Sequence, residues 1–208
     1  DRVTVIRRGK SIDTIDVSEA DPDKLATMMV GREVNLTVNR GKSKQGDEVL
    51  TIHDLVVQDE GKVPVVNHLN LQVHAGEIVG IAGVDGNGQS ELIEAITGLR
   101  KIASGKVLIN GEDITSYSPR KVFEAGVGHI PQDRHKHGLV LDFSVGENMV
   151  LQSFYQKPYS AKGVLSYSNI FGKAKELIKE FDVRTPSELT PARALSGGNQ
   201  QKAIIARE

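Results

Sequence analysis

Residues 77–90 read EIVGIAGVDGNGQS, an apolar run followed at once by a glycine-rich loop. The run, residues 77–82, is short and rich in β-branched side chains, which is typical of a strand buried on both faces of a parallel sheet. The loop, residues 83–90, has the spacing of the phosphate-binding pattern G-x-x-x-x-G-K-[ST], and an apolar-faced helix is predicted directly after it. In such loops backbone N–H groups and the helix N-terminus bind phosphate, and the Ser or Thr hydroxyl binds Mg²⁺. This order of elements predicts an α/β fold.

The phosphate-binding loop departs from the pattern in its charges. Gln89 stands where the pattern has Lys, Asp85 lies inside the loop, and Glu91 lies in the first helical turn. Each change weakens anion binding, so a tight strand-to-helix turn without a ligand explains the loop equally well when it is taken alone. A dinucleotide fingerprint is excluded because Glu91 occupies the place of its third glycine. The candidate nucleotide contacts in this loop are Gly83, Asp85, Gly86, Asn87, Gly88, Gln89, Ser90 and Glu91.

A second motif, LSGGNQQK at residues 195–202, directly precedes an apolar helical start. A hydroxyl and free amides at a helix N-terminus form an anion site, although a lone Ser-Gly-Gly is usually only a helix cap. The two motifs in this order resemble the ATP-binding cassette (ABC) family, whose signature motif is LSGGQ, and LSGGNQQK is similar to the form found in its sugar and nucleoside importers. The resemblance implies a P-loop NTPase fold with a mixed sheet, an antiparallel β part and a helical subdomain. It also implies ATP contacts at Ser196, Gly197, Gly198 and Gln200.

Residues 128–134 fit the same resemblance, with a strand predicted at 127–130. Gln132 matches the glutamine loop of the family, whose amide reaches Mg²⁺ or the attacking water and senses the membrane subunit; a polar loop at a strand end is the alternative. Ser90 and Gln132 are therefore the expected Mg²⁺ ligands, and Gln132 is the candidate for a catalytic role. His135 and His137 are expected to be solvated, because an i, i+2 pair without further ligands is a poor metal site.

The amino-terminal part predicts a hairpin over residues 2–16, a helix that begins after Asp21 and ends at Gly31, and a polar linker over residues 32–47. It resembles the closing hairpin and helix of a preceding cassette, so residues 1–47 are interpreted as the tail of that cassette and residues 48–208 as a second nucleotide-binding domain. In the family the Walker B aspartate, the catalytic glutamate and the switch histidine follow the signature motif. We therefore expect the second domain to be truncated after that motif and this chain by itself not to hydrolyse ATP. Further strands are predicted at 49–57, 69–73 and 106–109, and helices after Ser118, after Ser144 and over 170–181.

Composition constrains the partners. Lys and Arg number 26 and Asp and Glu 27, so the net charge of −1 provides no global field for nucleic acid. No cysteine is present, which excludes disulfides and thiolate metal sites, and no stretch reads as a membrane span or signal peptide. With the resemblance, the expected function is the ATP-binding part of an importer for a nucleoside or simple sugar at the cytoplasmic face of the membrane. Its expected partners are permease subunits, a second cassette and, indirectly, a substrate-binding lipoprotein. The alternative is a catalytically silent regulatory cassette that supplies its signature motif in trans.

Overall fold

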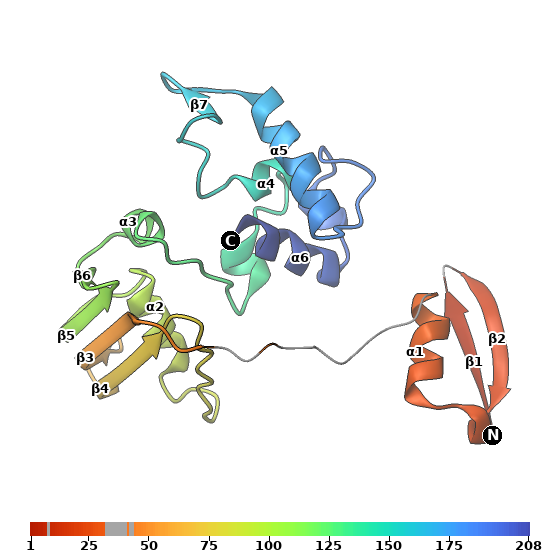
Figure 1. Cartoon of the computed structure of the whole chain (residues 1–208), viewed down its shortest axis with the longest axis horizontal. Helices are drawn as coiled ribbons and strands as arrows, with labels where there is room; N and C mark the ends of the chain where they lie inside the picture. Colours follow the sequence, from red (N-terminus) through yellow and green to blue (C-terminus); the bar gives the residue numbers. More distant parts are fainter. Residues whose placement is uncertain (8, 32–40, 42–43) are drawn as a thin grey trace. The chain divides into compact units, whose positions relative to one another are not determined.

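The computed structural model describes residues 1–7, 9–31, 41 and 44–208, and it divides into two compact units, residues 1–44 and 45–208 (Figure 1). Most of the predicted linker, residues 32–47, lies outside the described residues. None of the helices in the described ranges is long and apolar enough to cross a membrane.

The first unit is a hairpin with one helix. β1 (Arg2–Arg7) pairs antiparallel with β2 (Lys10–Asp16), and a short 3₁₀ turn (Val17–Glu19) leads to α1 (Pro22–Val30). The side chain of Asp21 accepts a hydrogen bond from Lys24 N at 2.7 Å, and Gly31 ends the helix at φ 84°. This capping residue, the proline at the first helical position and the left-handed glycine confirm the predicted helix bounds.

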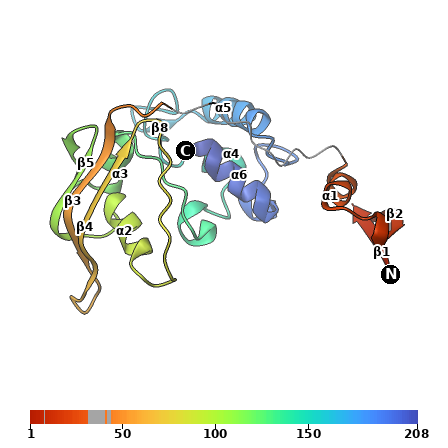
Figure 2. The ribbon, with the colours of Figure 1, turned by 60° about the horizontal axis from the view of Figure 1, so that its bottom comes forward.

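The second unit begins with an antiparallel sheet in the order β4-β3-β5-β6. β3 (Glu48–Gln58) pairs with both β4 (Pro64–His74) and β5 (Ile102–Ile109), and β6 (Glu112–Asp113) follows β5 through a turn with Asn110 and Gly111 at positive φ. The strands predicted at 49–57, 69–73 and 106–109 are confirmed. α2 (Gln89–Ile96) and α3 (Pro119–Glu124) lie along one side of the sheet (Figure 2). Their apolar residues join the sheet in one core, which includes Ile52, Leu55, Val57, Leu92, Ala95, Val107 and Val122.

The rest of this unit is the helical part (Figure 1). It contains α4 (Val145–Met149), α5 (Tyr167–Glu180), α6 (Gly197–Arg207), a 3₁₀ turn (Ala192–Ala194), a π-helical turn (Arg134–Gly138) and the small hairpin of β7 (Ser160–Ala161) and β8 (Val164–Leu165). Ser144 and Glu147 form the reciprocal capping box that begins α4. The predicted apolar stripe of α5 is also confirmed, because Ile170 and Ala174 are buried and Leu177, Ile178 and Phe181 pack beside them.

Two predicted strands are wrong in this structure. Residues 77–82 and 127–130 form no strand, and the side chains of Ile78, Ile81 and Ile130 are 78%, 54% and 51% exposed. A strand is stable only when its backbone groups bond to neighbouring strands, and among the described residues neither segment has a paired neighbour. The expected parallel sheet is therefore not formed within the described part of the chain, where every paired strand is antiparallel.

Candidate nucleotide-binding site

The glycine-rich loop leads directly into α2. Gly88 precedes the helix at φ 89°, and Gly86 lies in the loop at φ 86°. Gly88 is buried against the backbone carbonyl of Val65, so a side chain there would collide with the sheet. The glycine spacing found in the sequence thus has a structural cause, because only glycine tolerates this conformation and this close approach.

Gln89 is folded back over its own loop. Its Nε2 donates a hydrogen bond to the carbonyl of Val84 at 3.3 Å and lies against Gly83. Asp85, Gly86, Asn87 and Ser90 are exposed. The side chain in the position of the usual lysine therefore contacts the loop itself and brings no positive charge.

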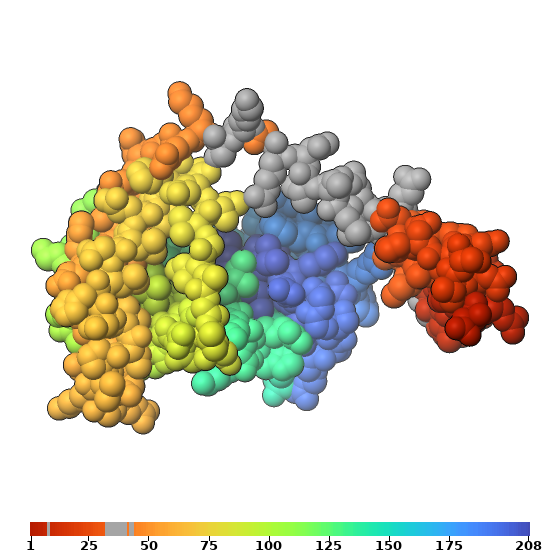
Figure 3. Space-filling view, turned by 90° about the horizontal axis from the view of Figure 1, so that it is seen from below, coloured from red at the N-terminus to blue at the C-terminus, as the bar shows by residue number. Residues whose placement is uncertain are grey.

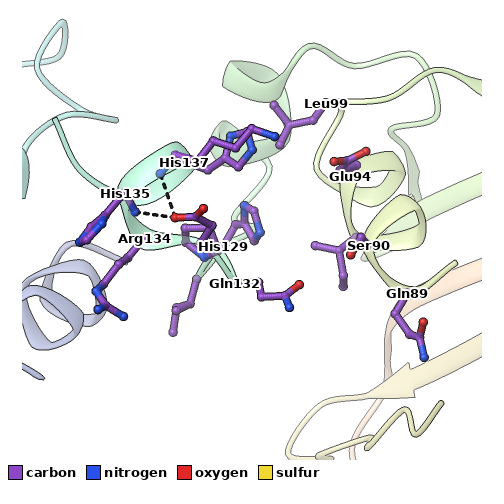
Figure 4. A pocket seen from close by; sticks show the side chains of 15 residues that line it. Gln89, Ser90, Glu94, Leu99, His129, Gln132, Arg134, His135 and His137 are labelled. Carbon is purple, nitrogen blue, oxygen red and sulfur yellow. Dashed lines mark hydrogen bonds between the residues drawn. The ribbon is translucent and has the colours of Figure 1, made fainter. Parts of the chain in front are cut away.

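A pocket of about 950 Å³ separates the start of α2 from the segment that precedes α4 (Figure 4). Gln89, Ser90 and Glu94 line one side, and residues 128–137, including Gln132, line the other. The structure thus places Ser90 and Gln132, the two predicted Mg²⁺ ligands, around one space. Both offer neutral oxygens, which fits an ion that keeps several waters and is bound mainly through a nucleotide's phosphates. The described residues contain no group of three or more His, Cys, Asp or Glu that could hold a metal ion without such phosphates.

The second phosphate-type motif lies at the start of α6. Ser196 precedes the helix with extended backbone, and its hydroxyl accepts a hydrogen bond from the Asn199 side chain at 3.0 Å instead of capping a backbone amide. The first amides of a helix have no intrahelical partner. Ser196 and Gly198 are exposed, so this helix start presents a hydroxyl and amides to the surface.

Comparison with known proteins accounts for both motifs. The family model described as "ABC transporter" matches residues 66–208, which include both of them. The chain belongs to this family. It is 62% identical over its whole length to the guanosine import ATP-binding protein NupO of Bacillus subtilis and 51% identical to the nucleoside import ATP-binding protein NupA of Lactococcus lactis subsp. cremoris. It covers 41% of each of these proteins, so it spans about two-fifths of the length of the curated relatives it matches.

Solved structures show the same fold. The crystal structure of a nucleotide-free ATP-binding cassette from an ABC transporter superposes with a TM-score of 0.61 at 24% sequence identity, over 77% of this chain and 64% of that one. The dimeric ADP- and phosphate-bound cassette MJ0796 gives a TM-score of 0.61 at 22% identity, over 76% of this chain and 68% of that one. The fold is therefore that of an ABC nucleotide-binding cassette, a P-loop NTPase fold with an antiparallel β part and helices, as predicted.

Within this cassette, Gln200 lies away from the exposed start of α6. Its side chain is only 4% exposed, and Oε1 accepts hydrogen bonds from Arg134 Nε at 3.1 Å and His135 Nε2 at 3.0 Å. Nε2 donates to the carbonyl of Ala192 at 3.1 Å. The predicted nucleotide contact at Gln200 is thus a side chain engaged inside the protein. His135 and His137 are exposed, as predicted, and the His135 ring also bonds to Gln200 across 65 residues of sequence.

The cassette's pocket wall at residues 129–137 is locally basic although the chain is not. Arg134, Lys136 and the three histidines at 129, 135 and 137 line it, with Asp133 as the acid of this segment. The backbone amides of Lys136 and His135 bond to Asp133 and hold the pKa of its carboxyl below the usual value. Burial lowers the pKa of His129, which favours its neutral form. Sequence reasoning missed Arg134 as a neighbour of the signature motif, because the contact depends on tertiary packing.

Proposed function

We propose that this chain is part of the ATP-binding subunit of an ABC importer that takes up a nucleoside. The two relatives named above are a guanosine import protein and a nucleoside import protein, to which the chain is 62% and 51% identical. Ribose and glucose import proteins match at 34–41%, which makes a simple sugar the second candidate cargo. Residues 1–47 would be the tail of a preceding cassette and residues 48–208 the second cassette. The whole subunit would be peripheral and would bind permease subunits at the cytoplasmic face of the membrane. A substrate-binding lipoprotein would be an indirect partner.

One observation supports an unequal pair of ATP sites. At α2 the loop is occupied by its own Gln89 side chain, whereas at α6 the Ser196 side chain leaves the helix amides uncapped. In a pair of cassettes that face each other, residues 196–198 would bind the terminal phosphate of ATP held by the partner cassette. Backbone amides and a hydroxyl fixed at a helix start stabilise the charge that develops during phosphoryl transfer.

The residues of this cassette's own pocket would bind ATP weakly. Residues 86–88 shape the loop, Ser90 and Gln132 would hold Mg²⁺, and the basic wall at 134–137 would attract the phosphates. Bound Mg²⁺ would neutralise phosphate charge. The loop lacks the ammonium group that reaches the phosphates in lysine-containing loops, so this site favours a regulatory role, and the partner site would carry out most of the hydrolysis.

The test is uptake of radiolabelled guanosine by cells that depend on the full-length protein. Ser196→Arg should abolish uptake, because the side chain blocks the amides, while Gln89→Ala should leave most of it. Ser168→Arg places the same side chain at the exposed start of α5 and should leave uptake unchanged. Uptake that survives Ser196→Arg but is lost with Gln89→Ala would reverse the assignment of the working site.

A further inference from the structure

The π-helical turn Arg134–Gly138 rests on one face of α6. Gln200, Ile204 and Arg207 are spaced by four and three residues, which places them along a single stripe of the helix. In the space-filling view teal atoms from the middle of the chain adjoin blue atoms from its C-terminal part (Figure 3). This turn begins two residues after Gln132, so one segment joins the pocket to the signature helix.

Each residue of the stripe contacts the turn. Gln200 Oε1 accepts from Arg134 and His135, and Ile204 Cδ1 fills the space beside Gly138 that a side chain there would need. Arg207 Nη1 donates to the carbonyl of Gly138 at 2.6 Å. Contacts at the beginning, middle and end of α6 leave the turn little freedom to slide along the helix.

Burial makes the Gln200 contact specific. The side chain is 4% exposed and both of its polar atoms are bonded, and Ile204 beside it is 1% exposed. A buried amide that loses its partners incurs the full cost of desolvation, so the arrangement shown is strongly favoured over one with Arg134 and His135 withdrawn. Arg134 also lies over the helix start, since a side chain at Gly197 would meet its guanidinium at 3.0 Å.

We propose that Arg134 and His135 are positioning residues that act through Gln200, so that the turn after Gln132 and the start of α6 move as one body. A displacement of Gln132 in this cassette's pocket is then transmitted to residues 196–198, which the cassette presents to its partner. The inference rests on the proposed function only for what those three residues bind. The mechanical link itself concerns contacts within this chain.

The link is tested without nucleotide, by NMR-detected amide hydrogen exchange on the 208-residue chain. Gln200→Leu should speed exchange of the His137 and Leu139 amides, which close the turn, by about tenfold. Gln201→Leu makes the same change at the next, exposed position of α6 and should not affect them. Gln200→Glu keeps an acceptor for Arg134 and His135 but loses the donor to the Ala192 carbonyl, so it should restore part of the turn protection that leucine removes.

The reciprocal variant is Arg134→Ala at an exposed position, which should speed exchange of amides 201–204 in α6 severalfold. Lys136→Ala removes another basic side chain of the same turn and should leave those amides unchanged. In the double variant with Gln200→Leu, the increase in exchange from Arg134→Ala should not add to that from Gln200→Leu, because both substitutions break the same Arg134–Gln200 contact. Three results would each overturn the proposal. The first is equal exchange rates of the turn amides in Gln200→Leu and Gln201→Leu, the second is unchanged exchange of amides 201–204 in Arg134→Ala, and the third is additive effects in the double variant. If Gln200→Leu also speeds exchange in α5, and so disturbs the fold more widely, the comparison of Arg134→Ala with Lys136→Ala decides whether the link exists. A negative result here leaves the uptake test of the proposed function intact.

Discussion

Replacing Gln89 with lysine should convert a weak ATP site into an ordinary one. Gln89 is the first residue of α2, and its side chain contacts the loop through Val84. A lysine at this position brings an ammonium group to the same helix N-terminus, where the backbone amides already favour anions. The perturbation therefore adds the one group that the phosphate-binding pattern requires and the chain lacks.

The size of the effect follows from two contributions. A hydrogen bond to a charged group contributes about 1.5–3 kcal/mol, which corresponds to a gain in affinity of roughly tenfold to more than a hundredfold. The Gln89–Val84 bond that must break is long, at 3.3 Å, and lies at the surface. Its loss costs at most about 0.5 kcal/mol, or about a twofold change in affinity. The charge contribution therefore dominates.

Isothermal titration of the chain with MgATP measures this change, and Gln89→Met is the matched control. Methionine has a similar length and removes the Val84 bond without adding charge, so its Kd should remain within about threefold of the wild type. A Gln89→Lys variant that also stays within threefold would refute the reasoning. Equal gains from lysine and methionine would show that the contact with Val84, and not the missing charge, limits binding.

Three further outcomes are expected. Asn148 is 1% exposed, and its side-chain amide bonds to both the N–H and the carbonyl of Val140. Asn148→Asp cannot donate to that carbonyl, so it should lower the free energy of unfolding, measured by denaturant titration, by about 2–4 kcal/mol. A loss below about 1 kcal/mol would contradict this. The lowered pKa of Asp133 means that its bonds stabilise the turn Arg134–Gly138 above the usual carboxyl pKa and that this support is lost as pH falls through the folded-state value. The protection of the turn amides, which is the factor by which they exchange more slowly than a free peptide at the same pH, should therefore fall more on acidification in the wild type than in Asp133→Asn. Identical pH profiles of protection in the two proteins would contradict this prediction. Residues 77–82, which are exposed and pair with no strand of the described part of the chain, should exchange far faster than the centre of β3. Protection equal to that of β3 would show that they do form a strand.

Features encoded by a few neighbouring residues could be predicted from the sequence. The Asp21 cap, the capping box of Ser144 with Glu147 and the turn at Asn110 each depend on residues within three positions of one another. Their energetics are local, so the sequence specifies them directly. The positive φ of Gly86 and Gly88 belongs to the same class, whereas the close approach of Gly88 to the Val65 carbonyl depends on tertiary packing.

Features that depend on distant partners could not be predicted. Residues 77–82 have the composition of a buried strand, but composition cannot supply the neighbouring strands that such a segment needs. The partners of Gln200 lie 65 and 66 residues away, and an isolated glutamine in a helix start gives no sign of them. The sequence therefore indicated the candidate site as two motifs, while the contacts that join the pocket to the second motif appeared only in the structure.

The N-termini of α2 and α6 both present free backbone amides, but the side chains around them carry opposite charge. At α2 the amides have Glu91 in the first turn and Asp85 in the loop, and no lysine offsets these acids. At α6 the first turn contains no acid, and the guanidinium of Arg134 lies at Gly197. Since both helices offer the same partial positive charge at their N-termini, the surrounding side chains decide which start binds phosphate more strongly. They favour α6, so the helix start with the more favourable surroundings for phosphate is the one that we propose completes another cassette's site.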